Sequence, residues 1–237
     1  MFVRLLQLAV SLAAVLGVLY LVVPWFAKRL LQSRLLECTR RGGGICLTFD
    51  DGPDPQSTPE ILRLLDDAGA KGTFFLLGKQ AEKYPDLVRQ IVASGHEVGE
   101  HGHAHRHAWK TGPVTYLRDL LQGRRAVADA LGVDTVRVFR PAFGELNLLT
   151  LIYLVVGRRR LVMWSVNPRD FEQQLGSEVG ARVLRSLEPG SIVLLHDGRA
   201  DAPGGTDVTV EAVRLIVAEA VRRRLRLTTA SEAMGSR

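Results

Sequence analysis

The sequence predicts an α/β fold: one domain built on a parallel sheet, preceded by a single membrane-spanning helix. Past residue 44, short apolar runs alternate with longer segments of helical period, which is typical of repeated βα units around a parallel sheet. Ahead of them, 23 residues from Leu5 to Ala27 carry no charge, a stretch long enough to cross the hydrocarbon of a bilayer. The 237 residues therefore suffice for one large domain and an appendage.

The apolar N-terminus is predicted to be a transmembrane anchor over residues 1–28, in contact with the membrane through residues 5–27. A signal segment is the alternative. It is disfavoured because its apolar core is normally only about 7 to 15 residues long and precedes a small-residue cleavage site. In this prediction residues 29–43 form a basic linker that ends in Gly42-Gly43-Gly44, and residues 44–237 form the main domain.

The net charge of +6 belongs to the N-terminus. Residues 1–41 carry six basic side chains and one acidic one, a balance of +5, and the rest carry 25 basic and 24 acidic side chains, a balance of +1. The domain itself therefore gives no electrostatic reason to expect a nucleic-acid partner. Taken alone, the Lys and Arg residues that follow the apolar stretch would place the domain in the cytoplasm.

The hydropathy pattern predicts the elements of the domain in order. The expected strands are Ile45–Phe49, Thr73–Leu77, Glu97–Gly99, Val136–Phe139, Leu161–Val166, Ile192–Leu195 and Leu225–Leu227. The expected helices are Thr58–Ala68, Pro85–Ala93, Thr115–Leu131, Leu146–Val156, Glu178–Leu187 and Val208–Arg222.

Polar side chains come directly after several of these strands. Asp50 and Asp51 follow the first strand and precede a Gly-Pro turn, and Arg140, Asn167 and His196 follow later strands. Because the carboxyl ends of parallel strands and their loops build the active site in such folds, we expect these residues to meet. One of the paired carboxylates can bind a metal while the other takes a proton; a solvated Asp-Gly-Pro turn is the alternative.

Five of the six histidines lie between Gly95 and His107. Neutral imidazole is a good ligand for Zn²⁺, and the spacing of His101 and His105 puts both rings on one face of a helical turn. An extended segment would also bring His103 and His107 to that face, so spacing does not remove them. A solvent-exposed histidine-rich loop is the alternative, and His96, ahead of its strand, is interpreted as structural.

These residues suffice for metal-assisted hydrolysis. Asp51 with two histidines would leave a divalent ion with open positions for water and substrate. Asp50 could then act as general base, while a separate acid protonates the leaving group. His196 is the best placed candidate for that acid; a core-edge histidine that is already satisfied is the alternative.

The chain resembles the polysaccharide deacetylases, also called the NodB-homology or carbohydrate esterase family 4 group, from about Ile45 to Leu227. The motifs that carry the resemblance are Thr48-Phe49-Asp50-Asp51-Gly52-Pro53, the His101 and His105 pair, Phe139-Arg140-Pro141-Ala142-Phe143-Gly144 and Leu194-Leu195-His196. It implies a distorted (β/α)7 barrel of the TIM-like, NodB-homology type. It also implies a catalytic base at Asp50, metal ligands at Asp51, His101 and His105, an arginine at Arg140 that positions the base, and a general acid at His196 beside Leu194.

The chain departs from the family pattern at several positions. Where the family usually has Asp-x-x-Asp-Trp, it reads Asn167-Pro168-Arg169-Asp170-Phe171, so the usual carboxylate partner of the acid histidine becomes an amide. An amide stabilises an imidazolium less well, unless Asp170 or Asp197 compensates.

The second motif also differs. Glu100 stands in place of the usual Asn, which would add a carboxylate near the metal, and Gly102 removes a hydroxyl that commonly braces the histidine loop. Trp109, close to that loop, is either a packing aromatic or part of a sugar subsite.

The expected function is removal of N-acetyl groups, less favourably O-acetyl groups, from an extracellular or cell-wall glycan with one divalent ion. Zn²⁺ is the expected ion, with Co²⁺, Mn²⁺ or Ni²⁺ as alternatives. A deacylase of a lipid-linked sugar is the second hypothesis, and a metal- or glycan-binding protein with weakened catalysis is the third, motivated by Asn167. The family resemblance favours a single-pass protein of the cytoplasmic membrane with an external domain, against the flanking charges.

Overall fold

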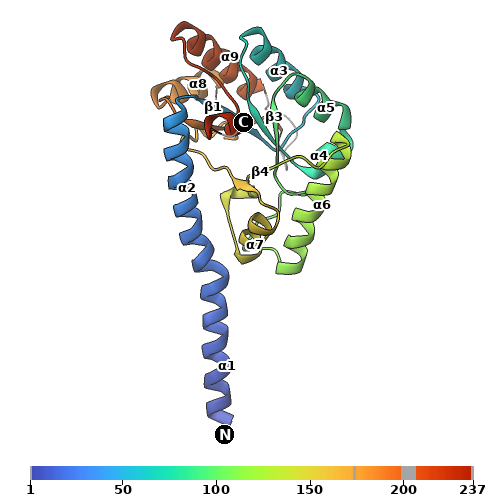
Figure 1. The fold of residues 1–237 in the computed structure, drawn as a ribbon, viewed down its shortest axis with the longest axis vertical. Coiled ribbons are helices and arrows are strands. Elements are labelled where there is room, and N and C mark those ends of the chain that lie inside the picture. Colours follow the sequence, from blue (N-terminus) through green and yellow to red (C-terminus); the bar gives the residue numbers. More distant parts are fainter. Residues whose placement is uncertain (1, 173–174, 199–206, 236–237) are drawn as a thin grey trace.

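The computed structural model describes residues 2–172, 175–198 and 207–235. Within them, six parallel strands form one sheet in the order β5-β4-β3-β2-β1-β6. The strands are β1 (Cys46–Asp50), β2 (Thr73–Leu76), β3 (Glu97–Glu100), β4 (Val138–Phe139), β5 (Arg160–Leu161) and β6 (Ile192–His196). The sheet curls, with helices on its outer side (Figure 1), and the predicted α/β architecture is confirmed.

One segment reaches both edges of the curled sheet. It begins as β5 at one edge, and Val166 then pairs with Val193 of β6 at the other. The predicted strand 161–166 is interrupted between these two pairings. There the carbonyl groups of Val162 and Met163 accept hydrogen bonds from the Arg140 side chain. The last predicted strand, 225–227, shortens to a single bridge between Leu227 and Ile45.

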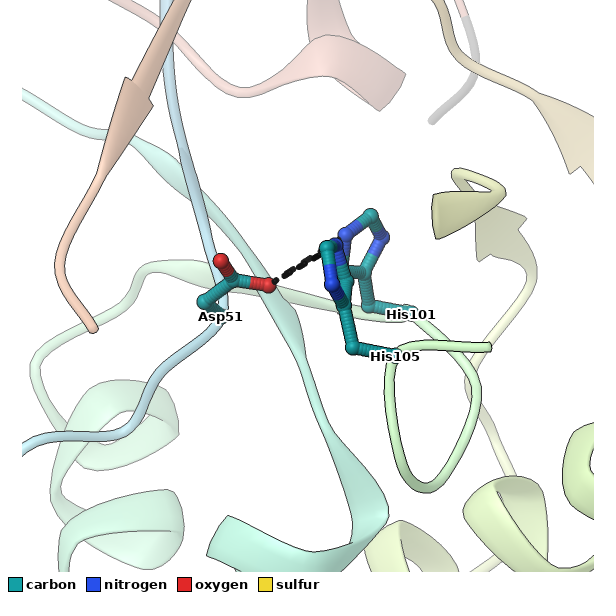
Figure 2. Close-up of side chains that lie close together, drawn as sticks. All are labelled: Asp51, His101 and His105. Atoms are coloured by element: carbon teal, nitrogen blue, oxygen red, sulfur yellow. Dashed lines mark ion pairs between the residues drawn. The ribbon is translucent and has the colours of Figure 1, made fainter. Parts of the chain in front are cut away.

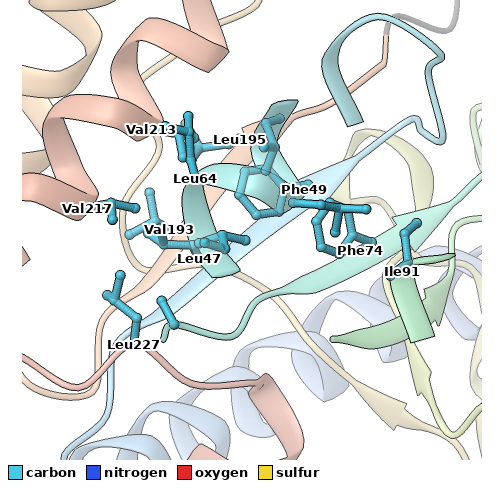
Figure 3. Packing of buried hydrophobic residues seen from close by; sticks show 14 of the residues in the cluster. Leu47, Phe49, Leu64, Phe74, Ile91, Val193, Leu195, Val213, Val217 and Leu227 are labelled. Atoms are coloured by element: carbon cyan, nitrogen blue, oxygen red, sulfur yellow. The ribbon is translucent and has the colours of Figure 1, made fainter. Parts of the chain in front are cut away.

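Strand alternation sends side chains to the two faces of the sheet, and each face carries a buried hydrophobic cluster. In β1, Leu47 and Phe49 belong to the outer core, whereas Thr48 and Asp50 point to the opposite face. The outer core also holds Phe74 from β2 and Val193 and Leu195 from β6, packed against helices (Figure 3). This alternation leaves the inner face of the sheet free for chemistry.

The predicted helices are all present, with ends shifted by a residue or two. They are α3 (Ser57–Asp67), α5 (Pro85–Ala93), α6 (Pro113–Leu131), α7 (Leu148–Val156), α8 (Gly176–Arg185) and α9 (Asp207–Arg222). Three short elements escaped prediction: α4 (Gly78–Lys83), the 3₁₀ turn η2 (Ala142–Gly144) and α10 (Ala230–Ala233). Each is too short to show a helical period.

The N-terminus forms one helix over Phe2–Gly42, made of α1 (Phe2–Gly17), a π-helical turn η1 (Val18–Val22) and α2 (Val23–Gly42). It projects far beyond the domain (Figure 1), and its apolar window is long enough to cross a membrane. The segment 29–43, expected as a linker, is helical up to Gly42 because Leu35 and Thr39 are buried against the domain. Gly43 ends the helix in the left-handed conformation, φ 68°, that glycine favours.

Candidate active site

The inner face of the sheet opens into a pocket of about 440 Å³. Eight of the predicted site residues line it: Asp50, Asp51, His101, His105, Pro141, Asn167, Leu194 and His196. The remaining lining residues are Phe143, Gly144, Trp164, Phe171 and Gly198. Its volume lies in the range of small-molecule sites, about 300 to 1,000 Å³.

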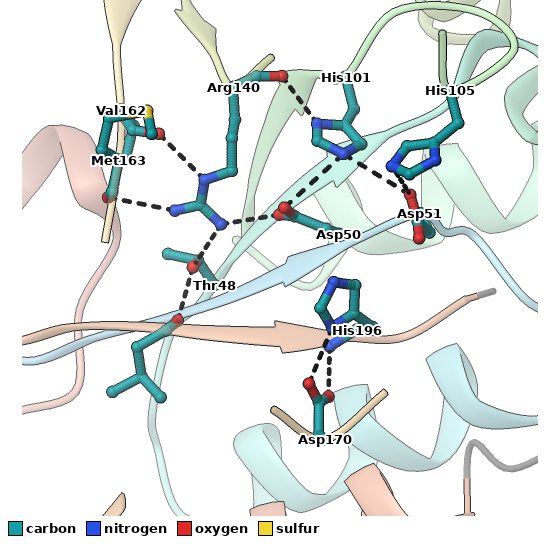
Figure 4. A network of polar contacts seen from close by, with 11 residues as sticks. Thr48, Asp50, Asp51, His101, His105, Arg140, Val162, Met163, Asp170 and His196 are labelled. Atoms are coloured by element: carbon teal, nitrogen blue, oxygen red, sulfur yellow. Dashed lines mark hydrogen bonds and ion pairs between the residues drawn. The ribbon is translucent and has the colours of Figure 1, made fainter. Parts of the chain in front are cut away.

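Asp50 is held by a buried arginine. The Nη1 atom of Arg140 donates to Asp50 Oδ1 at 2.7 Å and to the Thr48 hydroxyl at 2.8 Å (Figure 4). The guanidinium also stacks on Phe75, 4.2 Å from the ring centroid. Burial lowers the pKa of Arg140, and the nearby Asp50 carboxylate acts in the opposite direction by raising this pKa. The second oxygen, Asp50 Oδ2, lies 3.7 Å from His101 Nε2 and faces the histidines.

Asp51, His101 and His105 converge with one ligand atom each, all within 4.8 Å of one another (Figure 2). Asp51 Oδ1 lies 3.6 Å from His101 Nε2 and 3.5 Å from His105 Nε2. His101 Nδ1 bonds the carbonyl oxygen of Arg140 at 2.7 Å, which fixes the ring and leaves Nε2 to face Asp51.

These three residues fit a divalent ion. Asp51 Oδ1 is buried and accepts no hydrogen bond from the described residues. Two ligand atoms about 2.1 Å from a tetrahedral ion are roughly 3.4 Å apart, close to the separations found here. Asp51 and His105 also hold positive φ angles, 72° and 52°, a costly conformation for non-glycine residues that is concentrated at functional sites.

His196 lies beside Asp50, since the two residues are paired in the register of β6 and β1. Its Nδ1 atom is 2.8 Å from Asp170 Oδ1, and its backbone N–H donates to Asp170 Oδ2 at 2.7 Å. Burial alone would lower the pKa of His196, but the Asp170 carboxylate outweighs it and raises that pKa to about 9.

Of the alternatives left open by Asn167, the structure shows the one in which Asp170 supplies the carboxylate. The carboxylate partner of His196 is Asp170, whereas Asn167 lines the pocket and accepts a hydrogen bond from the backbone of Arg169. Asp197, the other suggested substitute, binds the Thr58 hydroxyl at 2.6 Å instead. Burial raises the pKa of Asp197 to about 7.

Glu100 does not add a carboxylate to the metal site, contrary to expectation. Its side chain is buried and bonds Arg159 Nε at 2.8 Å and the Tyr153 hydroxyl. Burial raises the pKa of Glu100, which both partners oppose. It follows that Glu100 is a structural residue of β3.

The additional histidines lie outside the pocket lining. His103 Nε2 is 3.0 Å from Gln122, and the His107 ring packs 5.1 Å from that of Phe143. His96 accepts a hydrogen bond from the Gly72 backbone and is buried, which lowers its pKa to about 4, so its structural interpretation is confirmed.

A carboxylate on α6 braces the histidine loop in place of the hydroxyl lost at Gly102. Asp119 accepts hydrogen bonds from the backbone N–H groups of His103 and Ala104, both at 3.0 Å. Gly102 has φ 79°, and a Cβ atom there would come within 2.9 Å of Asp119. A glycine at position 102 therefore permits the positive φ of the turn and leaves room for the Asp119 side chain.

Sequence reasoning missed the aromatic wall of the pocket: Phe143, Trp164 and Phe171. Single aromatic residues in loops carry no pattern, although Phe143 and Phe171 belong to motifs that the sequence did reveal. Phe171 stands edge-on to His196, with ring centroids 5.5 Å apart.

Comparisons with known proteins agree with this geometry. A family model described as polysaccharide deacetylase matches residues 39–154. The chain is 38% identical over 154 residues to a chitooligosaccharide deacetylase of Sinorhizobium fredii, covering 65% of this chain and 72% of that protein. It is 34% identical over 190 residues to a peptidoglycan-N-acetylglucosamine deacetylase of Bacillus cereus, covering 79% and 86%.

Among solved structures, a peptidoglycan N-acetylglucosamine deacetylase superposes with a TM-score of 0.74 at 30% identity, covering 82% of this chain and 89% of the other. The fold and the pocket define a carbohydrate-active hydrolase. The chain belongs to the polysaccharide deacetylase family.

Proposed function

We propose that this protein removes N-acetyl groups from a glycan by metal-assisted hydrolysis, with Asp50 as base and His196 as acid. The observation that carries the proposal is the arrangement around one pocket: three metal-ligand side chains, a carboxylate fixed by Arg140, and a histidine fixed by Asp170. The named activities of the relatives support the same chemistry.

Asp51, His101 and His105 would hold the divalent ion, and Zn²⁺ suits a carboxylate and two imidazoles best. When bound, such an ion polarises a carbonyl group and lowers the pKa of water. Asp50 takes a proton from the attacking water through Oδ2, since Oδ1 is occupied by Arg140.

His196 then donates a proton to the departing amine. With Nδ1 turned to Asp170, the ring can present Nε2 to the pocket as the donor. Phe143, Trp164 and Phe171 add apolar surface to the same pocket, and electrostatic interactions are stronger beside apolar surface than in bulk water. The Asp170 contact supports an active enzyme over a catalytically weakened protein.

The protein is proposed to be anchored in the cytoplasmic membrane by its N-terminal helix with the domain outside. The apolar window of Phe2–Gly42 supports the anchor, and relatives that act on peptidoglycan support an external domain.

The proposal is tested by acetate release from N-acetylchitooligosaccharide with full-length protein in detergent and Zn²⁺. Asp50→Asn should lower kcat at least about a hundredfold, because general base catalysis is worth that much, while elemental analysis still finds bound zinc. Asp51→Asn, a near-isosteric control in the adjacent position, should lose zinc as well as activity. An Asp50→Asn variant with unchanged kcat would overturn the mechanism.

A further inference from the structure

One helix of the domain exposes an entirely apolar face. Helix α7 contains no charged residue, and its Ile152, Val155 and Val156 side chains are 48%, 77% and 80% exposed. Figure 1 shows α7 at the end of the domain from which α1 projects. Contiguous exposed apolar surface of this kind marks an interaction site.

The N-terminal helix is fastened to this same end. Asn147, which caps α7 by accepting from the Thr150 backbone, donates its Nδ2 to the Tyr20 hydroxyl at 2.8 Å. Tyr20 lies inside the uncharged stretch, so α7 stands beside residues that a membrane would enclose. At 1.5 Å per residue, residues 2–22 are about 30 Å long, the thickness of a bilayer's hydrocarbon layer. A span of residues 2–22 would place the start of α7 at the bilayer boundary.

A strip of rings connects the catalytic pocket to that boundary. Phe143 lines the pocket 4.4 Å from the His105 ring, His107 lies 5.1 Å from Phe143, and Trp109 lies 6.0 Å from His107 (centroid distances). Trp109 in turn faces the N-terminal helix across an apolar groove of about 290 Å³, lined by Leu21, Val22, Trp25 and Phe26.

The charges around this end suit a membrane surface. Lys28 and Arg29 follow Trp25 and Phe26, and Lys110 follows Trp109. Arg29 stacks on Trp25, with its guanidinium carbon 4.9 Å from the ring centroid. Aromatic rings beside cations are typical of the headgroup region, where anionic lipids attract Lys and Arg.

We infer that α7 and Trp109 seat the domain on the bilayer and that the glycan it deacetylates is attached to a membrane lipid, whose chain occupies the groove beside Trp109. The inference rests on the proposed function and specifies its substrate class. A lipid-linked sugar would reach the pocket along the strip of rings without leaving the membrane surface. A soluble glycan would gain nothing from the groove.

The test compares two substrates with the full chain in nanodiscs of phosphatidylcholine and phosphatidylglycerol. One is N-acetylchitobiose coupled to a dialkylglycerol in the same nanodisc, and the other is soluble N-acetylchitotetraose. Because sharing a bilayer raises the effective concentration of the lipid-coupled sugar, wild-type protein should release acetate from it at least about tenfold faster at equal bulk concentration. Equal rates on both substrates would overturn the inference.

A double variant isolates the surface from the catalytic site. Val155→Asp with Val156→Asp places two charges on the exposed apolar face of α7 and should reduce turnover of the lipid-coupled sugar about tenfold, with the soluble rate unchanged as evidence of correct folding. Val221→Asp on α9 is the control, because that valine is also exposed, at 58%, and α9 lies at the opposite end of the domain (Figure 1). Equal loss from both variants, or no loss from the double variant, contradicts the inference; no acetate from either substrate contradicts the proposed function itself.

Discussion

At the scale of single residues, the ionisable side chains of the pocket are held in place by charged partners. Asp50 keeps one oxygen on Arg140, and His196 keeps one nitrogen on Asp170, so each has a single direction in which to exchange a proton. Asp170 is fully buried and also accepts from the Thr209 hydroxyl at 2.8 Å, which makes it a rigid support. This rigidity lets the acid and the base act on the same substrate without rearrangement.

The pH profile should report the Asp170 contact. A general acid works only while protonated, so activity falls as pH rises through the pKa of His196, about 9. Asp170→Asn removes the charge that raises this pKa and should move the alkaline limb of kcat/KM to lower pH by about one unit or more.

Asn167→Asp is the matched control for that shift. It restores the acidic residue of the family motif but adds a negative charge away from the His196 contact, so the limb should stay in place or move slightly to higher pH. If the alkaline limb of kcat/KM stays at the same pH in the Asp170→Asn variant, the role of Asp170 as a positioning residue is contradicted.

Sequence reasoning brought the proposed reactive residues together because they lie at strand ends. Asp50, Asp51 and His196 each end or follow a strand, and parallel strands end together. Partners were harder to predict. Asp170 and Asn167 lie in one motif, and only the path of the backbone decides which of them reaches His196.

At the scale of elements, a buried ion pair ties β3 to the segment that leads into β5. Glu100 and Arg159 are 2% and 7% exposed, and their side chains meet at 2.8 Å. The pair was not predictable, since its members are 59 residues apart; Glu100 ends β3, and Arg159 immediately precedes β5. It stabilises the strand that ends immediately before His101, a proposed metal ligand.

Removing Arg159 should destabilise the folded protein, because Glu100 would remain buried without its partner. Arg159→Met is expected to lower the free energy of unfolding by about 3 to 5 kcal/mol, measured by denaturation in detergent, because it leaves a buried carboxylate unpaired. Arg124→Met is the control: its pair with Asp134 lies at the surface, with side chains 37% and 43% exposed, so the change should stay within about 1 kcal/mol.

The sign of the pH dependence gives a further check on this ion pair. Burial already raises the pKa of Glu100, and loss of the guanidinium raises it further. Stability of Arg159→Met should therefore fall as pH rises above the ordinary range of a carboxyl group. Equal destabilisation by the two arginine variants would contradict the structural role assigned to the buried pair.

Two segments differ from their sequence-based prediction because contacts with distant residues decide their structure. Residues 162 and 163 have strand-like composition, yet their carbonyl groups bond Arg140 and not a neighbouring strand. Residues 29–42 read as a polar linker, but burial of Leu35 and Thr39 keeps them helical. In both cases tertiary contacts override a local pattern.

At the scale of the whole molecule, the N-terminal helix and the domain form a continuous structure. The long helix packs on the domain through Leu35 and Thr39 and through the Tyr20 contact with Asn147. Such an arrangement fixes the height of the pocket above any membrane that the helix crosses. The length and hydropathy of the helix were predictable from the sequence. Its contact with α7 was not, because nothing around Tyr20 in the sequence indicates which residue its hydroxyl group binds.

We propose that one divalent ion, held by Asp51, His101 and His105, makes this chain a glycan deacetylase. The most direct measurement is acetate release from N-acetylchitooligosaccharide by chelated full-length protein during titration with Zn²⁺. The rate should rise from near zero, reach a plateau at one equivalent of zinc, and fail to rise in a His105→Ala variant. Full activity in chelated protein that elemental analysis shows to be free of metal would contradict the claim.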